Sequence, residues 1–67
     1  MSVAKTIEIT ASSKKGFEDA IQNGISRASK TVSKIQGAWV SEQKVDIKDG
    51  KIARYRVNLK LTFILTD

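Results

Sequence analysis

Apolar and polar residues alternate at the start of the chain. Between Val3 and Thr10, Val3, Ile7 and Ile9 fall on one face, while the other face carries small or polar residues. A period of two residues is typical of a β-strand with one buried face. The sequence therefore predicts a strand over this segment, which ends before the pair of serines that follows.

The next apolar residues are separated by three or four positions, as in one stripe of an amphipathic helix. The predicted helix runs from about Lys14 to Gln36, and Ser13 is its candidate N-cap. Gly37 stands where a left-handed residue would end the helix. Gly24 lies on the stripe and lowers helix propensity by about 1 kcal/mol relative to alanine, so we interpret it as a close packing contact. The stripe consists of Phe17, Ala20, Ile21, Gly24, Ile25, Ala28, Val32 and Ile35.

Asp49-Gly50 predicts a two-residue hairpin turn of type I′ between two further strands, 38–48 and 51–65. The turn fixes the register, because residues that face each other across it are equally far from it. The predicted pairs are Lys48–Lys51, Ile47–Ile52, Gln43–Arg56, Val40–Leu59 and Trp39–Lys60.

This register gives the hairpin two different faces. The face expected to cover the helix carries Ala38, Val40, Tyr55, Val57, Leu59, Leu61 and Phe63, interrupted by Glu42 and Lys44. The other face carries the single tryptophan, Trp39, among the polar groups of Gln43, Arg56, Asn58 and Lys60. An aromatic ring in these surroundings is either an anchor between subunits or a stacking platform for a planar ligand.

Composition excludes several kinds of chemistry. The 67 residues include no Cys, His or Pro, so there is no disulfide, no thiol nucleophile and no imidazole base or ligand. Asp46 and Asp49 flank the predicted turn, but a calcium ion needs several more oxygens than this loop supplies. The chain carries no apolar segment typical of a signal peptide or a membrane span, so we expect a cytoplasmic protein.

The short length favours self-association. A compact monomer of this size exposes roughly 4200 Å² and buries only about 60% of the surface of the open chain. Small domains without disulfides or metals usually gain stability by forming oligomers. The net charge of +5 permits nucleic-acid binding. We consider that function less well supported, because the basic residues are scattered and there is only one tryptophan.

The order of short motifs along the whole chain resembles the dodecin family. Those motifs are Gly-Phe-Glu-Asp-Ala (16–20), Ser-Lys-Thr-Val (29–32), Gly-Ala-Trp-Val-Ser-Glu-Gln (37–43), Lys-Asp-Gly-Lys (48–51) and Tyr-Arg-Val-Asn-Leu-Lys-Leu-Thr-Phe (55–63). The resemblance implies one α+β domain over residues 1–67, with a β-α-β-β protomer whose three-stranded antiparallel sheet partly wraps round one helix. It also implies a hollow homododecamer that stores flavin stacked on tryptophan, and a protein that is not an enzyme.

Two positions depart from the flavin-binding members of that family. An ungapped alignment places Gly37 where their stacking tryptophan stands, two residues before Trp39. Arg56 takes the place of a glutamine that binds the edge of the isoalloxazine ring, and it offers hydrogen-bond donors only.

Two functions follow from the resemblance and from the exposed-face tryptophan. In the first, riboflavin or FMN stacks on Trp39, Gln43 supplies polar contacts, and Arg56 holds ring oxygens or a phosphate. In the second, Trp39 packs between subunits of an oligomer without flavin, and a basic surface around Arg54, Arg56 and Lys60 binds anions such as coenzyme A. Neither function involves nucleic acid or a membrane.

Overall fold

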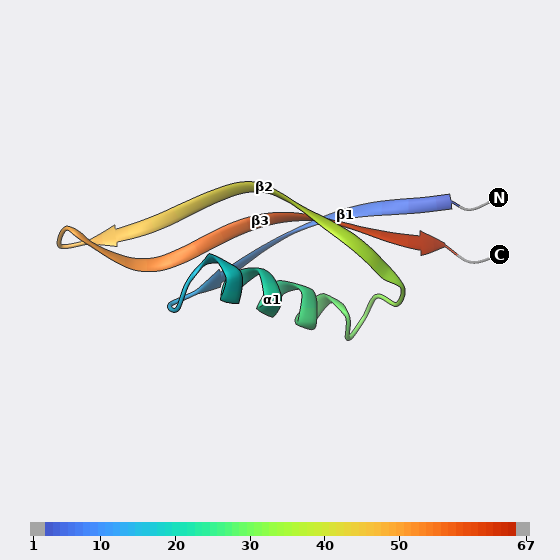
Figure 1. Ribbon diagram of the computed structural model, residues 1–67, viewed down its shortest axis with the longest axis horizontal. Coiled ribbons are helices and arrows are strands. Elements are labelled where there is room, and N and C mark those ends of the chain that lie inside the picture. The colour runs from blue at the N-terminus through green and yellow to red at the C-terminus, as the bar shows by residue number, and fades with distance from the viewer. Residues whose placement is uncertain (1–2, 66–67) are drawn as a thin grey trace.

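The computed structural model describes residues 3–65, which form one sheet and one helix. The sheet is antiparallel in the order β1-β3-β2, and α1 lies along one side of it (Figure 1). This arrangement confirms the predicted α+β fold with its β-α-β-β order and three-stranded sheet. The elements are β1 (Val3–Ser13), α1 (Phe17–Ala28), β2 (Ile35–Lys48) and β3 (Lys51–Leu65).

The buried core lies between α1 and the strands β1 and β3. Three adjacent inward positions of β3, Val57, Leu59 and Leu61, are at most 1% exposed, and Ala20 of the helix is fully buried. We call the face of the sheet that carries these β3 residues the helix-side face. The opposite face is called the open face, because α1 does not cover it.

Gly24 allows the helix to lie close to the sheet, as its place on the apolar stripe predicted. A Cβ atom at this position would stand 3.0 Å from Cβ of Ala11, 3.2 Å from Cδ1 of Leu59 and 3.3 Å from Cδ1 of Ile9. These distances are shorter than ordinary van der Waals contact. The glycine therefore sets how closely α1 packs on β1 and β3.

The predicted ends of the helix were wrong. The helix ends at Ala28 instead of Gln36, and Gly37 lies within β2 rather than at a helix C-terminus. Weak helix formers, two of them β-branched, follow Ala28 and favour termination there. The apolar spacing continued past that point because Ile35, the first residue of β2, packs against the same core.

Ser13 is not the N-cap of α1. Gly16 occupies that position, without a side-chain capping bond. The Ser13 hydroxyl instead accepts a hydrogen bond from the Lys15 backbone N–H at 2.9 Å and donates one to Asp19. It thereby holds the turn between β1 and α1.

The hairpin turn is the one predicted, since Asp49 and Gly50 both have positive φ angles of 52° and 75°. The predicted register is correct next to the turn and again at Trp39–Lys60 and Val40–Leu59. Between these points it is wrong by one residue, because one bulge adds Ala53 to β3 and a second adds Ser41 to β2.

The offset changes which face the middle of β2 presents. Gln43 pairs with Val57 instead of Arg56, and Lys44 pairs with Arg56. Paired residues point to the same face. Gln43 therefore lies on the helix-side face, whereas Glu42 and Lys44, expected on that face, lie on the open face.

Candidate ligand-binding face

The open face presents one side chain from each strand in successive rows across the sheet. The strands supply these rows because alternate residues of a strand point to the same side. Two successive rows are Glu8–Lys60–Trp39 and Thr10–Asn58–Glu42.

Trp39 is the most exposed large apolar side chain on this face, at 63% of its full surface. Its cross-strand partner is Lys60. Its neighbour two positions earlier, Gly37, has no side chain, and a Cβ atom there would have no atom within 4 Å. One side of the indole is therefore open to a flat ligand or to another protein chain.

Arg56 also lies on the open face, but its guanidinium is already engaged. Its Nε donates to Oδ2 of Asp46 at 2.8 Å, and this ion pair is partly exposed. The hydrogen bond from Arg56 holds the pKa of the Asp46 carboxyl below its ordinary value of 3.8, and the nearby charges of Arg56, Lys44 and Arg54 act in the same direction. Arg56 is four residues from Lys60, or roughly 13 Å along the strand from the level of Trp39.

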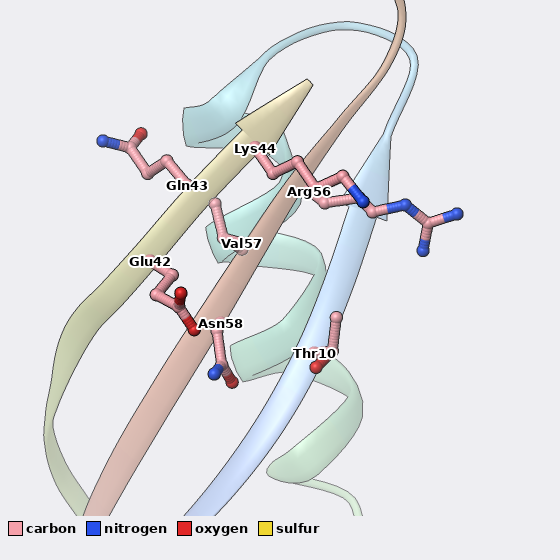
Figure 2. Close-up of a pocket in the computed structure, with 7 residues that line it drawn as sticks. All are labelled: Thr10, Glu42, Gln43, Lys44, Arg56, Val57 and Asn58. Carbon is pink, nitrogen blue, oxygen red and sulfur yellow. The ribbon is translucent and has the colours of Figure 1, made fainter. Parts of the chain in front are cut away.

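The three residues that the sequence proposed as a binding site do not meet within one protomer. Trp39 and Arg56 share the open face at different levels, and Gln43 lies on the other face. Figure 2 shows Gln43 pointing away from Lys44 and Arg56. A ligand that touched all three side chains would have to lie between protomers.

The structure keeps Asn58 on the face of Trp39 and gives it specific contacts. The sequence placed Asn58 on this face but gave it no role. Its Nδ2 donates to Oε2 of Glu8 at 2.9 Å, and its backbone oxygen accepts from the Ser41 hydroxyl at 3.0 Å. Glu8 and Asn58 are 50 positions apart, so this contact gave no local signal in the sequence.

Asn58 borders a shallow hollow on the open face (Figure 2). The hollow has a volume of about 220 Å³. Complete small-molecule sites usually enclose roughly 300–1,000 Å³, so one protomer forms only part of such a site. The lining residues are Thr10, Glu42, Gln43, Lys44, Arg56, Val57 and Asn58.

Residues 3–65 contain neither a metal-binding cluster nor a membrane-spanning helix. No group of three or more acidic, His or Cys side chains gathers there to hold a metal ion. The helix in this part of the chain is too short and too polar to span a membrane.

The fold and the sequence together define the class of protein. A sequence model of the dodecin family matches residues 3–66, and the chain belongs to this family. This confirms the resemblance found in the sequence motifs. Dodecins are small binding and storage proteins rather than a class of enzymes.

Solved dodecin structures match almost the whole chain. The dodecin of Streptomyces coelicolor has 32% sequence identity and a TM-score of 0.93 over 98% of this chain and 94% of that one. A variant of the T. thermophilus dodecin has 31% identity and a TM-score of 0.95 over 100% of this chain and 98% of that one. The calcium dodecin of Mycobacterium tuberculosis has 31% identity and a TM-score of 0.84 over 97% and 93%. No curated protein sequence matches the chain.

Proposed function

We propose that this dodecin binds and stores flavin, as riboflavin or FMN, and does not catalyse a reaction. Flavin binding is typical of the family to which the chain belongs. The observation that carries the proposal is the 63% exposure of Trp39 on the open face. Polar side chains lie beside it, and Gly37, two positions earlier, leaves the neighbouring space open. An isoalloxazine ring is planar and aromatic, and it gains free energy by stacking on such an indole.

The proposal includes a homo-oligomer, with twelve copies as the expected number and residues 1–67 as one domain. The protomer exposes 5061 Å², compared with roughly 4200 Å² for a compact monomer of the same mass. Part of the excess is apolar surface on β2, where Val40 is 43% and Ile47 is 59% exposed. Contact with further copies would bury this surface and enlarge the shallow hollow.

Arg56 and Gln43 remain part of the proposed site as contacts made between protomers. Arg56 would first have to share or release Asp46 before it could hold a ring oxygen or a phosphate. Gln43 would reach a ring on Trp39 only from a second copy, since it lies on the helix-side face of its own sheet.

Flavin fluorescence tests the proposal directly. We expect purified protein, freed of ligand, to quench riboflavin or FMN at micromolar protein concentration, because a stacked flavin loses its emission. The same preparation should have a mass twelve times that of one chain. If flavin fluorescence does not change, the protein has no flavin site.

Trp39→Ala separates stacking from subunit packing. If the indole is a platform, the variant should bind flavin up to about tenfold more weakly, the free energy that an aromatic contact usually contributes, and should keep its mass. Ile52→Ala is the control, because Ile52 is also exposed, at 51%, but lies on β3 next to the hairpin turn. Loss of the oligomer in Trp39→Ala alone would favour the interface role.

A second candidate function is an oligomer that binds an anion such as coenzyme A. It is favoured by three basic residues of the open face, Lys44, Arg54 and Lys60, for which residues 3–65 supply no ion-pair partner. Protein that is colourless when purified, does not quench flavin and binds coenzyme A would support this function.

A further inference from the structure

The orientation of the Asn58 carboxamide is fixed by Glu8. A carboxylate can only accept a hydrogen bond, so the amide nitrogen must be the group that faces it at 2.9 Å. The amide oxygen, Oδ1, then points away from Glu8. Asn58 can therefore offer an acceptor, but no further strong donor, on that side.

Asn58 Oδ1 has no hydrogen-bond partner within the described chain. Of all side-chain oxygen and nitrogen atoms of residues 3–65, it is the one that is buried and unpaired. Buried polar atoms are nearly always hydrogen-bonded in native proteins, and an unpaired one is costly. A group from outside the protomer is the natural partner for this oxygen.

The position of Asn58 relates this oxygen to Trp39. Asn58 is two residues from Lys60, which faces Trp39 across the strands. Such diagonal neighbours are about 7–8 Å apart, within reach of an aromatic side chain and of a ligand stacked on it. Arg56, by contrast, is one further row away and is held by Asp46.

The Asn58 side chain borders open space on the open face. Asn58 lines the hollow of this face, and Glu42 and Lys44 also border it. Both of these side chains are exposed, and exposed side chains change rotamer rapidly. Rotamer changes of these two side chains would widen the hollow without moving the strands.

We propose that Asn58 Oδ1 accepts a hydrogen bond from the imide N–H of a flavin ring that stacks on Trp39. The assignment rests on the proposed flavin function and adds the residue that recognises the polar edge of the ring by a hydrogen bond. The ligand class is a planar heteroaromatic ring with an N–H between two carbonyl groups. Lys60, with three ammonium donors, lies beside Asn58 and suits one of those carbonyl oxygens.

The test compares riboflavin with 3-methylriboflavin, which has a methyl group in place of the imide hydrogen. Wild-type protein should bind the methylated ligand about tenfold more weakly, the usual cost of leaving a buried acceptor unpaired. Asn58→Ala should bind riboflavin about tenfold more weakly than wild type and should no longer distinguish the two ligands, since alanine removes the acceptor and makes room for the methyl group.

Asn23→Ala is a matched control. The substitution is the same, and the Asn23 Nδ2 also donates to a carboxylate, that of Asp19 at 3.2 Å. Asn23 differs in lying on the exposed surface of α1. This variant should distinguish the two flavins as wild type does. If Asn58→Ala does not assemble, Asn58→Val replaces it, because a β-branched residue suits a strand and also lacks the acceptor.

The possible failures are distinct. If wild-type protein does not quench riboflavin, the proposed function is wrong and this assignment falls with it. If wild-type protein binds both flavins equally, the flavin function stands and the assignment to Asn58 is wrong. The assignment is also wrong if Asn58→Ala still discriminates against the methylated flavin, because the penalty then arises elsewhere.

Discussion

Strands β2 and β3 form one hairpin, yet their apolar residues have different surroundings. Leu59 of β3 is fully buried, whereas Val40, which faces it on β2, is 43% exposed. The strands differ in their place in the sheet, since β3 is central and α1 packs on it and on β1, while β2 is an edge strand. The hairpin end of the ribbon also projects beyond α1 (Figure 1).

This difference shows that position, rather than hydrophobicity, decides burial in this protomer. The central strand supplies the core of the single chain. The edge strand has apolar residues that no other part of the protomer covers, and it carries the tryptophan proposed to bind flavin. We therefore expect substitutions at the buried inward positions of β3 to affect folding, and those of the exposed apolar residues on β2 to act mainly on assembly and ligand binding.

The largest expected effect is that of Leu59→Ala. Removal of a fully buried leucine side chain costs about 2–5 kcal/mol in unfolding free energy. Urea denaturation at a fixed protein concentration measures this cost, and the concentration must be fixed because an oligomer gains stability by mass action. Leu65→Ala, on the same strand but 45% exposed, is the control and should lose far less. Equal losses would contradict a core centred on Leu59.

Gly24→Ala should have a smaller effect. The new methyl group would crowd Ala11, Leu59 and Ile9, and overpacking of this kind costs about 1–3 kcal/mol. A gain in helix propensity of about 1 kcal/mol partly offsets it, so a net loss of about 1 kcal/mol is expected. The control is Gly37→Ala on β2, where nothing lies within 4 Å. A variant at Gly24 as stable as wild type would mean that the helix can move outward freely.

The smallest expected effect concerns Asp46 on β2. The pKa of Asp46 is lowered in the folded protein. Its pair with Arg56 therefore stabilises the fold above pH 3.8, and this stabilisation is lost as the pH falls below that value. Asp46→Asn should slightly lower the urea midpoint at neutral pH and have little effect in strong acid. In an Arg56→Gln background, the substitution should matter less at every pH. A difference that is unchanged by pH would show that the charge of Asp46 is not what stabilises the fold.

Much of the fold could be predicted because its signals are local. The strand period, the amphipathic stripe and the Asp49-Gly50 turn each depend on neighbouring residues, and all three are confirmed. The end of the helix was missed because Ile35 continues the helical spacing although it begins β2. The prediction of the candidate face was also partly correct, because it placed Trp39 opposite Lys60 and on the side of the sheet away from the helix.

The remainder depended on contacts between distant strands. Two bulges shift the register and then restore it, so the residues on either side of the shifted stretch were still placed correctly. Between them, Gln43 turns to the helix side.

The sequence by itself determined the order of elements, the turn and the family, because each depends on residues close together in the chain or on the order of motifs. Only the tertiary structure decided that Gln43 leaves the face of Trp39 and that Glu42 and Lys44 join it, because the bulges that shift β2 form between distant strands. The contact between Glu8 and Asn58 joins residues 50 positions apart, and it exists because β1 pairs antiparallel with β3.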